Sequence, residues 1–510
     1  MTLNSDPVTT AAVHDGELER ASRSPAPWIF AWAAAILPLL GWWAYGLLDM
    51  DEGFYGSVVA EMNRRGAWIT PYYNGHPWFE KPILLYWLAK PCMALLGQQI
   101  GPRLPSILAT VGTYALIAWF ARRRWGDEAA RWCMLVAASC LLIVAVGRMM
   151  MTDALLDVCL VGAFTTFWES LVSDRRWRLS SAFFLGLSVL AKGPVGLALF
   201  AVIAGWTFWR ETELRPAFRG WWGTGTAVLA ATIGIWYLPA YLVNGHEFVQ
   251  KFLIEQNLDR FTGGDPAHTV PFLIGLVMYI LVIAVGTAPW SLYLWKAWPR
   301  DSDPLHRYLA VWAVVPFVLF AVSKAKLPHY VLPCAPPLAL LVGSYQSRRG
   351  SGSAGSPTRR LLFPAIACLA VAVVANVGFI LYYRRSGQAE IHALAAYVRD
   401  HVQPGQDVAA FQMPRRQHDL GTLKPTIQET ELPSLSMILN RTVDEPDSMD
   451  SLLSDPNGEW VLTRKGRVTP ADVDAAHKVS REFSPHATPV AQNGYRLFYL
   501  SPALGIRERR

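Results

Sequence analysis

The sequence predicts a polytopic α-helical membrane protein, with about eleven transmembrane helices and a small C-terminal α/β domain. Three observations support this prediction. The 510 residues are 52% hydrophobic and only 17% charged, whereas soluble proteins carry about 25% charged residues. Apolar runs recur along residues 27–383, and most are close to the length of about 20 residues that spans a bilayer. Residues 384–510 lose this pattern and are more polar.

Each of the apolar runs is a candidate transmembrane helix. The first is longer than the core of a signal peptide, which has about 7–15 residues, and we expect it to remain as an uncleaved span. Lys192-Gly193-Pro194 divides the stretch at 178–209 into two short pieces. The runs cover residues 27–48, 103–122, 131–147, 153–172, 178–192, 194–209, 222–243, 270–298, 308–322, 328–346 and 361–383.

Arginine clusters between the runs predict the orientation of the chain. Examples are Arg122-Arg123-Arg124 and Arg348-Arg349. Loops rich in Lys and Arg stay in the cytoplasm, and eleven spans put every such cluster there if the tail 1–26 is also cytoplasmic. We therefore expect the loop 49–102 and the segment 384–510 on the outer, extracytoplasmic side of the membrane.

The C-terminal segment 384–510 is predicted to form the soluble α/β domain. Its sequence has a helical pattern near Ala389–Asp400. Three apolar, β-rich runs follow, at Asp407–Gln412, Trp460–Thr463 and Tyr495–Leu500. The transmembrane domain would then comprise residues 27–383.

The charge distribution argues against a nucleic-acid-binding protein, and the cysteines argue against a CxxC zinc site or a disulfide-rich protein. The net charge of +7 comes from short clusters between apolar runs and not from a patch that would bind nucleic acid. None of the six cysteines forms a CxxC pair. Neither a zinc site of that type nor a disulfide framework is therefore expected.

The first two groups of candidate functional residues lie in the loop 49–102. Asp51 and Glu52 follow the first apolar run directly, where adjacent carboxylates are costly unless they are paired, solvated or bound to a cation. A helix N-cap at Asp51 is an equally good interpretation. Glu80 and Lys81 stand between Trp78-Phe79 and an apolar segment. Taken alone, an interfacial ion pair explains Glu80 and Lys81 better than a site does.

The remaining candidates lie at the ends of other runs. Asp153 begins the fourth run and Lys192 interrupts a later one. Ionisable groups at membrane depth are functional candidates, although a helix N-cap and a charged turn are the alternatives. His268 precedes the eighth run, and a single histidine is usually not a metal ligand. Lys324 and Lys326 lie on the predicted outer side, although lysines are usually more frequent in cytoplasmic loops. Binding a phosphate would explain their presence there.

Individually these signals are weak, but all of them fall on the same predicted side of the membrane. Carboxylates, lysines and aromatic residues from five outer segments would meet at one membrane surface. Such a composition is typical of a site for an anionic, lipid-linked substrate.

The motifs that contain these residues resemble those of the bacterial aminoarabinose transferases that modify lipid A, and more distantly those of the protein O-mannosyltransferases. The similarity covers about residues 27–345. The matching motifs are Asp51-Glu52-x-x-Tyr55, Gly75-x-Pro77-x-Phe79-Glu80-Lys81-Pro82, Thr152-Asp153-Ala154, Ala191-Lys192-Gly193-Pro194 and Ser323-Lys324-x-Lys326-Leu327-Pro328-x-Tyr330-x-Leu332-Pro333.

This resemblance implies a C-type glycosyltransferase fold and a role for individual residues. Asp51 is similar to the catalytic carboxylate of the family, and Lys81 to the lysine that neutralises the donor phosphate. We assign catalysis to Asp51, Lys81 and Asp153. Substrate contacts are assigned to Glu52, Tyr55, Lys192, Lys324, Lys326 and Tyr330. The resemblance also implies that Glu80 and His268 can hold a divalent metal ion such as Zn²⁺.

The resulting functional hypothesis is sugar transfer from an undecaprenyl-phosphate donor to lipid A or another envelope glycan or lipid. The sugar stays open, with 4-amino-4-deoxy-L-arabinose as one candidate, because Phe54 stands where the aminoarabinose enzymes carry an arginine. A transporter or flippase of lipid-linked saccharide is the alternative. The predicted acidic groups lie at one surface and not along the depth of the bundle, which favours the transferase.

Overall fold

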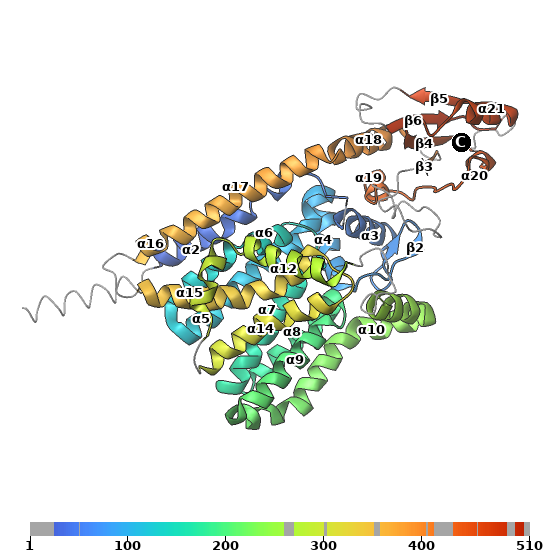
Figure 1. Cartoon of the computed structure of the whole chain (residues 1–510). Helices are drawn as coiled ribbons and strands as arrows, with labels where there is room; N and C mark the ends of the chain where they lie inside the picture. The colour runs from blue at the N-terminus through green and yellow to red at the C-terminus, as the bar shows by residue number, and fades with distance from the viewer. Residues whose placement is uncertain are drawn as a thin grey trace, which may run out of the picture.

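The computed structural model describes residues 25–49, 51–259, 270–299, 303–350, 357–403, 406–412, 432–455, 457–486 and 495–503. It consists of a large body of packed helices and a smaller domain of strands and short helices at one end of that body (Figure 1). The chain passes from the body to this domain through a long helix and the shorter helix that follows it, α17 and α18 in Figure 1.

The helical body is built around α7, which is buried along almost its whole length. A helix that is apolar on every side is typical of such a central position. The helices of the body are α2 (Ala26–Ile36), α3 (Glu52–Arg65), α4 (Leu84–Ile100), α5 (Leu104–Ala138), α6 (Leu141–Gly147), α7 (Thr152–Val172), α8 (Trp177–Lys192), α9 (Val195–Arg210), α10 (Thr226–Phe248), α12 (Phe272–Gly286), α13 (Leu294–Ala297), α14 (Pro304–Val322), α15 (Ala335–Gly350), α16 (Pro357–Arg360) and α17 (Leu362–Arg385). A short hairpin of β1 (Tyr72–Tyr73) and β2 (His76–Pro77) lies between α3 and α4.

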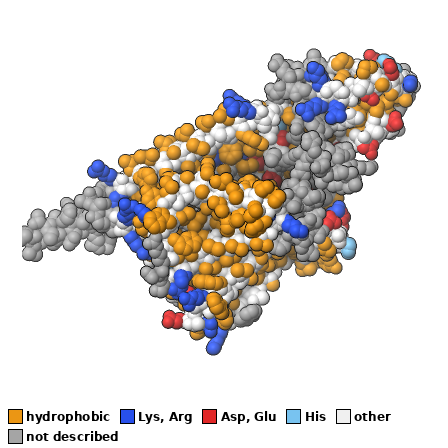
Figure 2. Space-filling model, viewed as in Figure 1, with side chains coloured by type: hydrophobic (Ala, Val, Ile, Leu, Met, Phe, Trp, Pro, Cys, Tyr) orange, Lys and Arg blue, Asp and Glu red, His pale blue; other side chains and the backbone are white. Residues whose placement is uncertain are grey.

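The surface of the body agrees with a multi-span membrane protein. Within the described residues, six helices are long and apolar enough to cross a membrane, or seven if a bent pair forms one span. Hydrophobic side chains cover most of the visible face of the body (Figure 2). Lys and Arg gather along the end that lies away from the C-terminal domain (Figure 2). The full count of eleven spans stays a prediction.

Several apolar runs are less regular than the sequence predicted. The first run is α-helical only to Ile36, and two short 3₁₀ turns follow it. Pro38 in the first turn has no N–H to donate, and Gly41 before the second turn has a φ of 89°. The run 270–298 bends by 98° between α12 and the segment Trp290–Ala297. The run 328–346 begins as a 3₁₀ segment, Pro328–Cys334, and only then continues as α15. An apolar composition predicts burial in lipid or protein, but it does not predict that the helix is continuous.

The C-terminal domain contains a mixed four-stranded sheet in the order β3-β4-β6-β5. Its strands are β3 (Asp407–Phe411), β4 (Glu459–Arg464), β5 (Phe483–His486) and β6 (Tyr495–Leu500), and only β3 and β4 run parallel. The predicted runs coincide with β3, β4 and β6, whereas β5 was not predicted. Its helices are α18 (Gln388–His401), α19 (Leu435–Leu439), α20 (Met449–Ser454) and α21 (Pro470–Lys478).

The C-terminal domain contacts the first loop of the body directly. The Pro433 carbonyl accepts hydrogen bonds from the Ser57 hydroxyl at 2.8 Å and the Tyr73 hydroxyl at 3.0 Å. Asn74 exchanges two hydrogen bonds of 2.8 Å with the backbone of Val443. The domain therefore rests on α3 and on the β1–β2 hairpin, beside the motifs of the loop 49–102.

Candidate functional site

An ion pair between α7 and α8 forms the centre of the site. Lys192 Nζ lies 2.5 Å from Asp153 Oδ1, and both side chains are largely buried. Lys192 ends α8 because Gly193, with φ of 76°, breaks the helix and Pro194 follows it. Asp153 lies in the first turn of α7, but the N-cap position belongs to Met151. The N-cap alternative for Asp153 is therefore wrong.

The segment after α14 completes this centre. His329 Nε2 lies 3.8 Å from Asp153 Oδ2. The Lys192 ammonium stands 4.3 Å from the centre of the Tyr330 ring, a distance typical of a cation–π contact. Lys192 is thus held on one side by a carboxylate and on another by an aromatic face, which fixes its position and orientation.

The loop 49–102 adds a carboxylate and a lysine. Asp51 is the N-cap residue of α3, as one interpretation predicted, but its side chain makes no capping hydrogen bond. Asp51 and Lys81 both interact electrostatically with His329, and Lys81 also with Asp153. These two residues therefore belong to the same group of charges as the ion pair between α7 and α8.

Tyr55 lies inside this group of charges and is only 4% exposed. Burial, followed by the charge of Asp51 and smaller effects of Asp153 and Glu80, raises the pKa of the Tyr55 phenol well above its ordinary value. The phenol consequently keeps its proton at neutral pH, so it can donate a hydrogen bond to an anionic substrate.

The structure brings together most of the predicted site residues from segments far apart in the sequence. The sequence analysis gave no role to His329, although its place beside Tyr330 in the last motif was a usable signal. The gathered residues are Asp51, Tyr55, Glu80, Lys81, Asp153, Lys192, His329 and Tyr330.

Glu52 is placed differently from its predicted contact with substrate. Its side chain is fully buried and forms a two-pronged ion pair with Arg103, at 2.7 Å from Nε and 2.6 Å from Nη2. The backbone N–H groups of Leu48 and Met150 also donate to it, at 2.9 and 2.7 Å. Because its oxygens already accept four hydrogen bonds, Glu52 braces the site instead of contacting the donor.

The two outer lysines after α14 do not join the cluster either. Lys326 is 4% exposed, and its ammonium donates to the carbonyls of Ser323 and Val270, the latter at 3.1 Å. Burial lowers the pKa of Lys326, so its predicted phosphate contact does not fit this environment. Lys324 is exposed, and no hydrogen bond or ion pair within the described residues links it to Asp153 or Lys192.

Of the two predicted metal ligands, Glu80 and His268, the structure describes only Glu80. Glu80 is half-buried at the site and interacts electrostatically with Tyr55. His268 lies outside the described residues. Among the residues that the structure does describe, no group of three metal-ligating side chains occurs at this site.

Comparison with known proteins places these motifs in a family context. The family model of dolichyl-phosphate-mannose-protein mannosyltransferases matches residues 80–237. An undecaprenyl phosphate-alpha-4-amino-4-deoxy-L-arabinose arabinosyl transferase of Erwinia tasmaniensis is 28% identical over 362 residues, and one of Edwardsiella ictaluri is 29% identical over 318 residues. The chain is similar in sequence to the lipid-linked aminoarabinose transferases.

The matches to these aminoarabinose transferases cover part of each protein. They include 68% and 59% of this chain, and 64% and 56% of the Erwinia and Edwardsiella proteins. The fold similarity extends further. The crystal structure of ArnT from Cupriavidus metallidurans bound to undecaprenyl phosphate superposes with a TM-score of 0.72, covering 92% of this chain and 97% of that one at 18% identity. The chain therefore has the same fold as ArnT.

Proposed function

We propose that the protein transfers a sugar from a polyprenyl-phosphate donor, undecaprenyl phosphate, to lipid A or another envelope acceptor. One observation carries this proposal: two lysines, Lys81 and Lys192, and two carboxylates, Asp51 and Asp153, lie close together in a single cluster of charges. The names of the relatives support the donor, and the resemblance of the motifs to those of the lipid A-modifying transferases supports the acceptor. The arginine clusters support a periplasmic position for the site in a bacterial inner membrane.

The proposed reaction exchanges two bonds at the anomeric carbon. The acceptor oxygen forms a bond to this carbon while the bond to the donor phosphate breaks, with inversion of configuration. The lipid phosphate leaves with the bonding electrons, and Lys81 stabilises the charge that develops on it. The Tyr55 phenol donates a hydrogen bond to the same group of oxygens.

Asp51 acts on the acceptor in this scheme. If the acceptor is a hydroxyl, the Asp51 carboxylate removes its proton as the new bond forms. If the acceptor is a phosphate of lipid A, it is already anionic and Asp51 orients the acceptor or the sugar. The Asp153–Lys192 pair holds its geometry throughout and stabilises the anionic donor.

Phe54 bears on the identity of the sugar. Its ring lies 5.7 Å from Trp78 and 5.8 Å from Tyr73, between ring centres, so an aromatic surface occupies this part of the loop 49–102. Aromatic faces suit the apolar faces of sugar rings, whereas an arginine suits a phosphate. The 4-amino-4-deoxy-L-arabinose of the relatives is the first sugar to test, and neutral sugars are the second.

We also propose a divalent metal ion, held by Glu80 and His268 with water or substrate as further ligands. A carboxylate and an imidazole suit Zn²⁺, but a zinc site needs about four ligands. Elemental analysis of His268→Ala and wild-type protein, purified in parallel, is the measurement. We expect less bound metal in the variant, and equal metal content in both would refute the site.

Lys81→Ala tests the proposed function itself. Losing the cation beside the leaving phosphate should cost on the order of 3 kcal/mol in the transition state, which is roughly a hundredfold in rate. Lys81→Arg should restore part of the rate, because it keeps the charge and changes the geometry. The measurement is transfer of a labelled sugar per folded molecule in detergent, with the donor at saturation.

A matched control for Lys81 is Lys251→Ala, because Lys251 lies just after α10, is half-exposed and pairs with Glu247 at the end of that helix. An unchanged transfer rate in Lys81→Ala would leave only a contact of Lys81 with the membrane interface. Passage of labelled donor across a vesicle membrane without any transfer to an acceptor would instead support the transporter alternative.

A further inference from the structure

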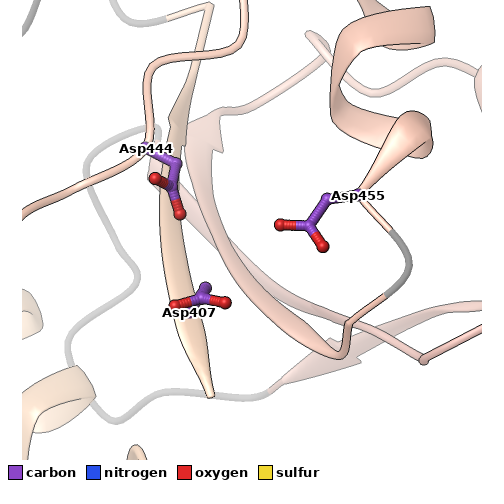
Figure 3. Close-up of side chains that lie close together, drawn as sticks. All are labelled: Asp407, Asp444 and Asp455. Atoms are coloured by element: carbon purple, nitrogen blue, oxygen red, sulfur yellow. The ribbon is translucent and has the colours of Figure 1, made fainter. Parts of the chain in front are cut away.

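Three aspartates in the C-terminal domain converge on one small space, far in the sequence from the site described above. Asp407 begins β3, Asp444 lies on a segment beside β3, and Asp455 follows α20 (Figure 3). One oxygen from each carboxylate lies within 4.8 Å of the other two. Calcium binds oxygen ligands at about 2.3–2.6 Å, so ligands on opposite sides of the ion are about 5 Å apart. The spacing of the three carboxylates fits this distance.

A fourth carboxylate, from Glu459, lies beside the three aspartates. Glu459 is paired with Asp407 in the parallel register of β3 and β4, so the two side chains lie on the same face of the sheet. Its side chain is only 2% exposed, and its Oε2 has no hydrogen-bond partner within the described structure. Its charge interacts with those of Asp444, Asp455 and Asp407. A buried carboxylate oxygen without a partner is costly, and an ion among these carboxylates would supply a partner for Glu459 Oε2.

Nearby arginines do not neutralise this cluster by direct contact. Arg441 and Arg481 interact electrostatically with it, but within the described residues neither forms an ion pair of 4.0 Å or less with the four carboxylates. Arg481 instead donates to the carbonyls of Ser501 at 2.8 Å, Asn457 at 2.5 Å and Asp455. It thereby fixes the backbone that carries Asp455.

The carboxylate of Asp455 is only partly engaged by the backbone. The hydrogen bond that Asp455 Oδ1 accepts from the Asn457 N–H, at 2.9 Å, leaves its other oxygen for a ligand.

We propose that Asp407, Asp444 and Asp455 bind a calcium ion, with Glu459 as a fourth oxygen ligand. The all-oxygen donor set favours a hard cation over Zn²⁺ or Cu²⁺. The ion would tie the start of β3, the segment at Asp444 and the α20–β4 connection together. It is a structural site of the C-terminal domain, and the inference does not rest on the proposed transfer activity.

Calorimetric titration of the full-length protein with CaCl₂ in detergent, after treatment with and removal of a chelator, tests this site. We expect one saturable site per chain in the wild type and at least tenfold weaker binding in Asp444→Asn. Asp474→Asn, on the exposed side of α21, is the matched control and should bind calcium as the wild type does.

Stability measurements separate lost binding from misfolding. Without calcium, Asp444→Asn should unfold at the same temperature as the wild type or a higher one, because one repulsive charge is gone; calcium should then stabilise only the wild type. No saturable binding by the wild type up to 10 mM calcium, or equal binding by Asp444→Asn, would overturn the proposal. Equally tight binding of Mg²⁺ would overturn the assignment to calcium.

Discussion

Asp51→Asn is expected to abolish sugar transfer without loss of folded protein. The substitution keeps the shape of the side chain and removes its charge. Asp51 makes no capping hydrogen bond to α3, so the helix loses little when the charge is removed. A missing general base typically costs a factor of about 10²–10⁴ in rate, and a lost interaction with the acceptor adds to this. The measurement is labelled-sugar transfer at saturating donor, with thermal unfolding recorded on the same sample.

The control for this prediction is Glu247→Gln, an exposed carboxylate at the end of α10. It should leave both activity and unfolding temperature unchanged. A well-folded Asp51→Asn protein with near-normal turnover would show that another group performs the role assigned to Asp51, and would restrict Asp51 to the start of α3.

Arg103→Met is expected to destabilise the protein by roughly 3–5 kcal/mol, because it leaves the buried carboxylate of Glu52 without its cation. Both side chains are fully buried. The guanidinium of Arg103 also donates to the carbonyls of Trp42, Tyr45 and Gly46, at 2.8, 2.9 and 2.7 Å. These bonds fix the chain just before Asp51. Thermal unfolding in detergent and the yield of folded protein measure the loss.

The double variant Arg103→Met with Glu52→Gln distinguishes the buried charge from the other lost contacts. It should recover part of the stability, because no unpaired charge remains. Arg399→Met is the control: Arg399 pairs with Asp400, and the two side chains are 45% and 60% exposed, so the pair contributes about 0–1 kcal/mol. If Arg103→Met were as stable as Arg399→Met, the Glu52–Arg103 pair would not stabilise the site.

The sequence located the candidate site because its residues fall in short motifs beside apolar runs. Asp51, Lys81, Asp153, Lys192 and Tyr330 were all predicted, and the structure brings them together. Ionisable residues at the ends of apolar runs are conspicuous, because an apolar environment tolerates few of them. The apolar runs likewise predicted a helical membrane body, and the three β-rich runs predicted β3, β4 and β6.

The sequence could not decide which charged residues are free to contact a substrate. Some of them already form ion pairs or hydrogen bonds within the protein. Glu52 stands directly beside Asp51, and Lys326 two residues after Lys324. Their roles differ because Arg103, 51 residues away, neutralises Glu52, and because the Val270 carbonyl holds Lys326. The convergence of Asp407, Asp444 and Asp455 is also invisible in the sequence, since these residues belong to a strand, a neighbouring segment and a helix end. By itself the sequence determined where charged residues stand at the ends of the apolar runs, and therefore which residues are candidates for a site. Only the tertiary structure decided their partners, because burial and pairing depend on contacts between distant segments.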